Sequence, residues 1–218
     1  FDPVGMVYDQ TVWTAKVTIA DVGGKLELSA KYYKNDSEEP ITGAMFSFDN
    51  SYNPEPAKLE GDTAIHGTKV LTGRDMAKGE TFGFKLSAAD EVTKAAIDSG
   101  TLTGIGTTAD LYSSEKTTTK LIPKDGTEQV DFNALTFKKA GTYKFTVQET
   151  NANAPTGWTY DSHTYEIIIK VTDQDSVLKA TQEINADGVT NSQIFINKFE
   201  ASTTYGDEGG LNVTKTLN

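Results

Sequence analysis

Residues 141–149 read Gly-Thr-Tyr-Lys-Phe-Thr-Val-Gln-Glu, and their side chains alternate between apolar and polar. Because successive side chains of a β-strand point to opposite faces, this alternation predicts a strand with one buried and one solvated face. The buried face would carry Tyr143, Phe145, Val147 and Glu149. The solvated face would carry Lys144, Thr146 and Gln148. The segment therefore predicts a packed β-sheet with a carboxyl group in line with its core.

Further strand patterns lie on both sides of this segment at short spacing. They cover residues 64–72, 80–87, 128–132, 163–171, 176–184 and 193–199. Seven strands at this spacing are typical of a β-sandwich. One short helix is also predicted over Ala88–Asp98, with Ser87 as its cap, Asp90 completing a capping box, and Gly100 just past its end. The polar stretch Thr107–Thr119 is predicted to be a surface loop.

The composition favours an all-β protein and excludes several functions. The chain has 31 Thr, 19 Gly and nine Tyr, which favour strands and turns. Its 31 acidic and 20 basic residues give a net charge of −11, which argues against a nucleic-acid partner. No apolar run approaches the ~20 residues of a membrane span, so no membrane insertion is expected. With no Cys, and with only His66 and His163, we expect no disulfide, metal site or cofactor.

Short motifs recur along the chain at nearly constant offsets. The sequence of residues 5–9, Gly-Met-Val-Tyr-Asp, recurs at 157–161 as Gly-Trp-Thr-Tyr-Asp. In the same way, Phe48-Asp49-Asn50 recurs as Phe195-Ile196-Asn197, and Thr68-Lys69 recurs as Thr214-Lys215. The offsets are 160 − 8 = 152, 197 − 50 = 147 and 215 − 69 = 146. They indicate tandem units of about 147 residues whose loops differ in length.

The repeat predicts how the chain is divided. Residues 1–53 would be the C-terminal part of a truncated repeat, and residues 54–62 would be a linker. Residues 63–200 would be a complete β-sandwich unit. Residues 201–218 would contain a linker and the first strand of the next repeat. We therefore expect the sequence to be part of a longer protein.

Three of the predicted strands place a polar side chain on an apolar face. Lys69 shares a face with Leu71, Asn197 shares a face with Phe195, and Glu149 closes the apolar face of its strand. A lone charge in a core costs several kcal/mol unless it is paired or neutralised. A solvated face does not explain the pattern, because the opposite faces already carry Lys144, Lys170 and Lys198. For Glu149, a partly wet strand end is an alternative explanation.

These residue types point to a covalent reaction. Burial lowers the pKa of a lysine and raises that of a glutamate, so that both groups shift toward their neutral forms. A neutral amine is a nucleophile, and a protonated carboxyl can hydrogen-bond to a carboxamide oxygen or shuttle protons. We predict that Lys69 Nζ attacks Asn197 Cγ beside Glu149, that ammonia leaves, and that an isopeptide bond remains. The reaction would occur once per chain, so the protein would not be an enzyme with turnover.

Other acidic residues have less specific patterns. Asp131 is the second candidate for the catalytic acid. Asp9 and Asp161 could assist the chemistry, but turn residues with local hydrogen bonds are the favoured interpretation. Asp173 and Asp175 could ligate calcium, although a plain hairpin turn explains them better.

The motifs together resemble the pilin isopeptide-linkage domain of Gram-positive surface proteins. The resemblance rests on Lys69-Val70-Leu71-Thr72-Gly73-Arg74, on residues 79–86, on residues 134–143 followed by 147–149, on Gly157–Asp161 and on Ile194-Phe195-Ile196-Asn197. It implies an Ig-like sandwich of the collagen-adhesin B type. It also implies a Lys69–Asn197 link formed under Glu149 as the catalytic acid. By the same pattern, Asn50 and Lys215 would be cross-linking residues whose partners lie outside the chain. The segment from about 88 to 120 is longer than this resemblance leads us to expect, so the predicted helix would lie in an insertion.

The resemblance also implies a place and a role. Members of the family build pilus shafts and adhesin stalks that sortase attaches to the cell wall, so we expect an extracellular protein whose partners are neighbouring repeats. No sortase recognition motif is present in the sequence. The alternative is a ligand-binding adhesin module that meets a host protein or glycan through residues 101–120. Trp158 and Tyr160 could then stack on a sugar, although packing inside the domain explains them better. A hydrolase is the weakest interpretation.

Overall fold

The computed structural model describes residues 4–43, 46–106, 112–150, 156–183 and 193–201. The chain divides into two compact units. The first comprises Phe1–Glu55 with Asp175–Val177, and the second comprises Pro56–Gln174 with Leu178–Asn218. Lys215 and the strand predicted near residues 208–218 lie outside the described residues.

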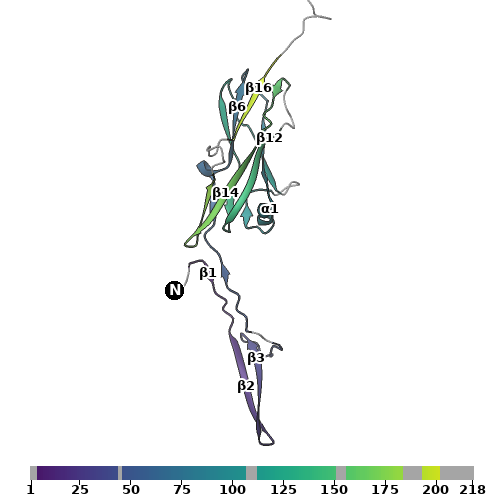
Figure 1. Ribbon diagram of the computed structural model, residues 1–218, viewed down its shortest axis with the longest axis vertical. Helices are drawn as coiled ribbons and strands as arrows, with labels where there is room; N and C mark the ends of the chain where they lie inside the picture. The colour runs from purple at the N-terminus through teal and green to yellow at the C-terminus, as the bar shows by residue number, and fades with distance from the viewer. Residues whose placement is uncertain (1–3, 44–45, 107–111, 151–155, 184–192, 202–218) are drawn as a thin grey trace, which may run out of the picture. The chain divides into compact units, whose positions relative to one another are not determined.

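Two β-sheets form the body of the second unit (Figure 1). One has the strand order β10 (Thr127–Asp131), β6 (His66–Thr72), β16 (Ile194–Phe199) and β13 (Trp158–Thr159). The other has the order β15 (Val177–Gln182), β14 (Thr164–Gln174), β12 (Gly141–Thr150), β7 (Gly83–Ala88) and β9 (Ser113–Thr117). Strands β6 and β16 pair in parallel, with Lys69 opposite Phe195. Strands β6 and β16, which are far apart in the sequence, therefore lie side by side.

The core lies between the apolar faces of these two sheets. Along β12 the buried positions are every second residue, as the sequence predicts, and they end at Glu149. Aromatic side chains contact one another across the core, with ring centroids of Phe84 on β7 and Phe195 on β16 only 5.2 Å apart. The prediction of an all-β fold with one short helix is confirmed. Among the described residues, no helix has the length and apolar content that a membrane span requires.

A small third sheet contains strands that the sequence analysis did not predict. Its order is β5 (Ala57–Leu59), β11 (Leu135–Phe137) and β8 (Leu102–Thr103). Strand β5 lies inside the segment 54–62 that we expected to be a linker. Its two apolar side chains, Ala57 and Leu59, are buried in the core, while Lys58 between them is exposed. Three residues are too few for a period-2 pattern to be recognised in a sequence.

The helix begins later than the sequence predicts. Helix α1 (Glu91–Asp98) has Asp90 as its cap, and the Asp90 carboxylate accepts a hydrogen bond of 2.8 Å from Thr93 N–H. Ser87 is instead part of β7, where its backbone pairs with Thr146. Because the sheet already satisfies these backbone groups, the helix can start only after the strand ends. A short 3-10 turn, η1 (Gly61–Thr63), precedes β6.

The segment predicted as a polar loop also contains a strand. Strand β9 pairs with β7 at the edge of the larger sheet. Its sequence, Ser-Ser-Glu-Lys-Thr, is polar because an edge strand has little apolar surface to bury. Residues 107–111 of the predicted loop lie outside the described residues.

The first unit consists of extended strands with little buried surface. It contains β1 (Met6–Val7) paired with β4 (Ser51–Tyr52), and the hairpin of β2 (Trp13–Val22) and β3 (Lys25–Lys34). Phe46 packs edge-on against Trp13 and Tyr32, at centroid distances of 5.5 and 5.4 Å. Several large apolar side chains are exposed: Val17, Ile19, Leu26, Leu28 and Phe48. This exposure is what part of a sandwich would leave, and a truncated repeat over residues 1–53 stays a prediction.

Gly73 follows directly after β6 and lies against the end of β16. Its φ is +93°, a conformation that favours glycine, and a Cβ atom at this position would lie 2.3 Å from the carbonyl oxygen of Phe199. Gly79 has nearly the same φ, +91°, but a Cβ atom there would meet no other atom within 4 Å. Alanine substitutions at Gly73 and Gly79 therefore distinguish the free-energy cost of the positive φ from the cost of the close contact with β16.

We predict that Gly73→Ala lowers the free energy of unfolding more than Gly79→Ala does. The dihedral angle alone should cost about 1–2 kcal/mol in both variants. In Gly73→Ala, the forced separation of β6 and β16 should add about 1–3 kcal/mol. Urea denaturation followed by circular dichroism measures both values. Equal losses in the two variants would show that the close approach at Gly73 is not needed.

Candidate cross-linking site

Lys69 lies in the middle of β6 with its side chain turned into the core. Its exposed fraction is 0%, although a lysine rarely lies inside a core. The ammonium nitrogen donates a hydrogen bond of 3.2 Å to the backbone oxygen of Phe195 on the neighbouring strand. It also lies 5.1 Å from the centroid of the Phe82 ring. The amine is therefore held inside the core, away from solvent.

Glu149 approaches the same place from the facing sheet. Its side chain, at the end of the apolar face of β12, is fully buried. The two carboxyl oxygens lie 3.0 and 3.2 Å from Lys69 Nζ. The position of this carboxyl follows from the alternation along residues 141–149, which turns every second side chain inward. A partly wet strand end, the alternative considered for Glu149, does not describe this buried side chain.

Asn197 completes the group from β16. Its exposed fraction is 0%, and its Nδ2 donates a hydrogen bond of 2.8 Å to Glu149 Oε1. Its Oδ1 accepts a hydrogen bond of 2.9 Å from the backbone N–H of Asp161. Because a backbone N–H can only donate, this bond fixes which end of the carboxamide is the oxygen. The carboxyl therefore contacts the carboxamide nitrogen, and not the carboxamide oxygen that we expected from the sequence.

Parallel pairing brings the amine and the carboxamide to one face of one sheet. In the register of β6 and β16, Lys69 lies opposite Phe195 and Asn197 lies opposite Leu71. The two side chains are therefore diagonal neighbours, separated by two residues along the strands. A one-residue slip of this register would turn Asn197 away from the core.

Burial is the main cause of the pKa shifts of the two ionisable groups. It lowers the pKa of Lys69 to about 8, against the opposing attraction of Glu149. It raises the pKa of Glu149, against the opposing attraction of Lys69 and the hydrogen bonds from Lys69 and Asn197. Each shift favours the neutral form of its group. A single proton transfer from the ammonium to the carboxylate converts the ion pair into a neutral pair.

The other predicted residues lie elsewhere. In the first unit, Asn50 is exposed, and its Oδ1 accepts a hydrogen bond of 3.0 Å from Asp9 N–H. Asp131, the second candidate for the acid, is exposed and accepts a hydrogen bond of 2.7 Å from Gln129. Asp175 and Ser176 both have positive φ and form the turn between β14 and β15, as the hairpin interpretation predicts. Within the described ranges, no group of three or more His, Cys, Asp or Glu side chains is arranged to hold a metal ion.

Trp158 and Tyr160, the two aromatic residues considered for sugar stacking, both pack against the ring of Phe82. Trp158 is buried, and its ring lies 5.4 Å from Phe82 and 5.3 Å from Phe199, measured between centroids. The guanidinium of Arg74 lies over both Trp158 and Phe199, and it is paired with the carboxylate of Glu80. The burial and edge-on contacts of Trp158 are those of a core residue.

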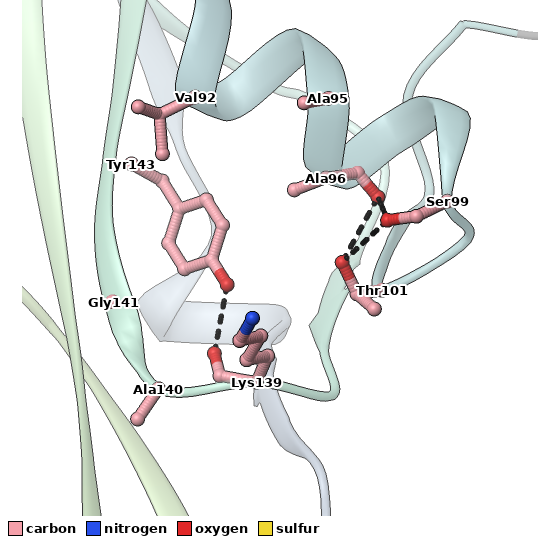
Figure 2. A pocket seen from close by; sticks show the side chains of 9 residues that line it. All are labelled: Val92, Ala95, Ala96, Ser99, Thr101, Lys139, Ala140, Gly141 and Tyr143. Carbon is pink, nitrogen blue, oxygen red and sulfur yellow. Dashed lines mark hydrogen bonds between the residues drawn. The ribbon is translucent and has the colours of Figure 1, made fainter.

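An open pocket of about 580 Å³ lies beside α1 (Figure 2), and none of Lys69, Glu149 and Asn197 lines it. Its lining is mostly small and apolar: Val92, Ala95, Ala96, Ser99, Thr101, Lys139, Ala140, Gly141 and Tyr143. The hydroxyl groups of the lining bond to neighbouring groups of the same lining. Tyr143 donates to Lys139 O at 2.7 Å, and Thr101 donates to Ala96 O at 3.2 Å. The pocket therefore offers a ligand few free polar groups.

Comparison with known proteins gave a family and a set of solved structures. The family model of FctA, described as a Spy0128-like isopeptide containing domain, matches residues 65–200. The structure of the major pilin from Streptococcus pyogenes matches with 16% sequence identity and a TM-score of 0.25, covering 89% of this chain and 64% of the pilin chain. A point mutant of that pilin gives 16% identity and a TM-score of 0.24, with 89% and 65% covered. The chain thus spans less than two thirds of the length of these pilins. A comparison with curated proteins found no match.

We predict that removing Lys69 makes stability depend on the protonation of Glu149. In Lys69→Met, the isolated carboxyl should cost roughly 3–5 kcal/mol near neutral pH. Because burial raises the pKa of folded Glu149 above its ordinary value of 4.5, the folded state binds more protons than the unfolded state. The free energy of unfolding of Lys69→Met should therefore rise as the pH falls from 7 toward 4.5.

The matched control is the double variant Lys69→Met, Glu149→Gln, which has no carboxyl to protonate. It should be more stable than Lys69→Met at pH 7, and its stability should change much less over the same pH range. Neither variant can form a Lys69–Asn197 bond, so the comparison is free of the cross-link. Parallel pH curves for the two variants would contradict a buried, proton-binding Glu149.

Proposed function

The chain belongs to the FctA family of Spy0128-like isopeptide-containing domains, and from this we propose that its second unit is a force-bearing structural domain of a pilus or adhesin stalk. We propose further that the unit stabilises itself by an intramolecular isopeptide bond between Lys69 and Asn197. Glu149 is the catalytic acid of that reaction. The reaction runs once in each chain, so the protein has no enzymatic turnover.

One observation carries this proposal: a single buried carboxyl contacts both the amine and the carboxamide nitrogen. Glu149 Oε1 lies 3.0 Å from Lys69 Nζ and 2.8 Å from Asn197 Nδ2. The first nitrogen must lose a proton during amide exchange, and the second must gain one. A carboxyl between them can accept the first proton and donate the second.

The steps balance without any further reactant. Lys69 first gives a proton to Glu149, and the neutral Nζ attacks Asn197 Cγ. A tetrahedral intermediate forms, in which the negative charge lies on Asn197 Oδ1. Nζ loses a second proton and Nδ2 gains one, so that the Cγ–Nδ2 bond breaks and ammonia leaves. An amide bond then joins the two side chains. The fixed geometry in the dry core supplies the proximity that a free amine and a free amide lack in water.

The bond would lie on the path of tension through the unit. It would close a loop of 197 − 69 = 128 residues, which stabilises the folded chain by roughly 4–5 kcal/mol in a loop-closure treatment. Tension that enters at the start of β6 and leaves at the end of β16 would cross from Lys69 to Asn197. The strands between them in sequence would then carry little load. A chain without Cys would gain a staple that reductants cannot open.

We extend the proposal to the whole protein as a surface structure. It is extracellular, attached to the cell wall of a Gram-positive bacterium, and its partners are neighbouring repeats. Asn50 and Lys215 are cross-linking residues whose partners lie outside residues 1–218. A ligand-binding adhesin module, the alternative function, would reveal itself by binding to a glycan or matrix-protein array.

We predict that the folded chain weighs one ammonia molecule less than its sequence, and that Glu149→Gln restores the full mass. The isosteric Gln keeps the packing but cannot carry protons between the two nitrogens. Intact-mass spectrometry measures the difference, and the melting temperature should fall in the same variant because the 128-residue loop is then open.

Glu128→Gln is the matched control for this measurement. Glu128 is also buried and lies opposite Lys69 in the pairing of β10 with β6, and its partner is Lys120 at 3.5 Å. This variant should still lose ammonia. A full mass in the unaltered chain would contradict the proposed bond, and a reduced mass in Glu149→Gln would show that another group is the acid.

We predict a bell-shaped dependence of the rate of ammonia loss on pH. The reactive pair needs one proton shared between Lys69 and Glu149. Below the raised pKa of Glu149 both groups are protonated and the amine is not nucleophilic. Above about pH 8, where Lys69 loses its proton, no proton remains for the leaving nitrogen. Mass spectra of refolding samples taken at timed intervals give the rate, and a rate that keeps rising above pH 9 would contradict the role of a protonated carboxyl.

A further inference from the structure

Asn197 Oδ1 is held by a backbone N–H whose own position is fixed by an acidic side chain. We propose that Asp161 is a positioning residue for the cross-linking reaction, because its carboxylate holds its backbone N–H against the oxygen where negative charge develops. The inference rests on the proposed function.

The Asp161 carboxylate ties two backbone segments together. One oxygen accepts a hydrogen bond of 2.8 Å from His163 N–H, and it also contacts Nδ1 of the His163 ring at 2.6 Å. The other accepts a hydrogen bond of 2.9 Å from Ile196 N–H, on the strand that carries Asn197. The ring is closed by the bond of 2.9 Å from Asp161 N–H to Asn197 Oδ1. The carboxylate thus fixes the backbone of Asp161 relative to Asn197 from two sides.

These bonds continue the pairing of β13 with β16 beyond its last backbone ladder pair. The ladder pairs Trp158 with Phe199 and Thr159 with Lys198. The same antiparallel register, extended by two residues, places Asp161 opposite Ile196. There the carboxylate and the carboxamide supply the acceptors for backbone N–H groups. The arrangement thus depends on a side-chain acid at this position of the register.

The first unit contains the same arrangement independently. Asp9 N–H donates to Asn50 Oδ1 at 3.0 Å. The Asp9 carboxylate accepts hydrogen bonds of 2.7 Å from Thr11 N–H and of 2.7 Å from Asp49 N–H. Strands β1 and β4 approach it in the matching register, with Met6 opposite Tyr52 and Val7 opposite Ser51. In the strand register, Asp9 therefore has the same position relative to Asp49 and Asn50 as Asp161 has relative to Ile196 and Asn197.

Within the described part of the chain, the hydrogen bonds around Asn50 form without a buried amine beside them. Asn50 is exposed, yet its carboxamide oxygen is held in the same way as that of Asn197. The dry core is therefore not what creates the hydrogen bonds. The Tyr-Asp motif and the paired Asn strand form them locally, so these bonds do not require a buried lysine.

The orientation matters for the reaction because of where the charge goes. When Nζ attacks Cγ, the carbonyl oxygen becomes an oxyanion, and a fixed N–H donor stabilises it without reorganisation. In enzymes that catalyse acyl transfer, loss of one such donor slows the reaction by roughly 10²–10³-fold. Because Asp161 variants keep the N–H and lose only its fixed position, we expect a decrease of roughly 10- to 100-fold.

The test measures the rate of ammonia loss in three variants. Asp161→Ala and Asp161→Glu should both lower the rate at the maximum of the pH profile by roughly 10- to 100-fold. The Glu variant keeps the charge but is one methylene too long to close the ring. Asp161→Asn keeps the length and one acceptor oxygen, so it should be slowed less than either. A purely electrostatic role would give the opposite order, with Glu close to the unaltered chain and Asn close to Ala.

Two controls make the result decisive. Each Asp161 substitution is also made together with Glu149→Gln, and circular dichroism of these unlinked chains shows whether they fold. Asp131→Ala, which removes an exposed Asp from β10 in the same sheet, should leave the rate unchanged. If the Asp161 variants fold and react at the unaltered rate, the inference is wrong. If the unaltered chain itself retains its full mass, the proposed function has failed first.

Discussion

A single carboxyl group shared between two nitrogen atoms in a dry core is the interaction on which the rest of the second unit depends. Glu149 comes from one sheet, and Lys69 and Asn197 come from the other, so the contact also spans the sandwich. Neither charge could be buried alone without a large loss of solvation. The two sheets must therefore close correctly before the three groups become compatible with each other. Folding and the chemistry proposed here have the same geometric requirement.

The sequence predicts much of this site because strands have a simple period. Lys69, Glu149 and Asn197 stand out since each interrupts an alternation of apolar side chains that is otherwise regular. The same period predicts β6, β12 and β16 to within two residues. Burial along these strands follows from local patterns, and so the polar side chains on their inner faces could be identified without a structure.

Features that depend on long-range register could not be predicted in this way. The sequence does not show which atom of the Asn197 carboxamide meets Glu149, because that choice depends on the backbone of Asp161, 36 residues away. Asp161 itself has the pattern of a turn residue, and it does bond locally to His163. Its second bond, to Ile196, needs the register of β13 with β16, and β13 has only two residues. The repeat of the Tyr-Asp motif at Asp9 was the one signal available for this role.

The parallel pairing of β6 with β16 has a consequence for the order of events in the life of the chain. Lys69 is synthesised early in the unit, and Asn197 is synthesised almost last. The site therefore cannot assemble until β16 has been synthesised and has docked. Until then the polypeptide is linear, without a link between its side chains. A link formed after docking would turn the same chain into a closed ring with two tails. The topology of the sandwich thereby sets the earliest moment at which the proposed bond between Lys69 and Asn197 can form.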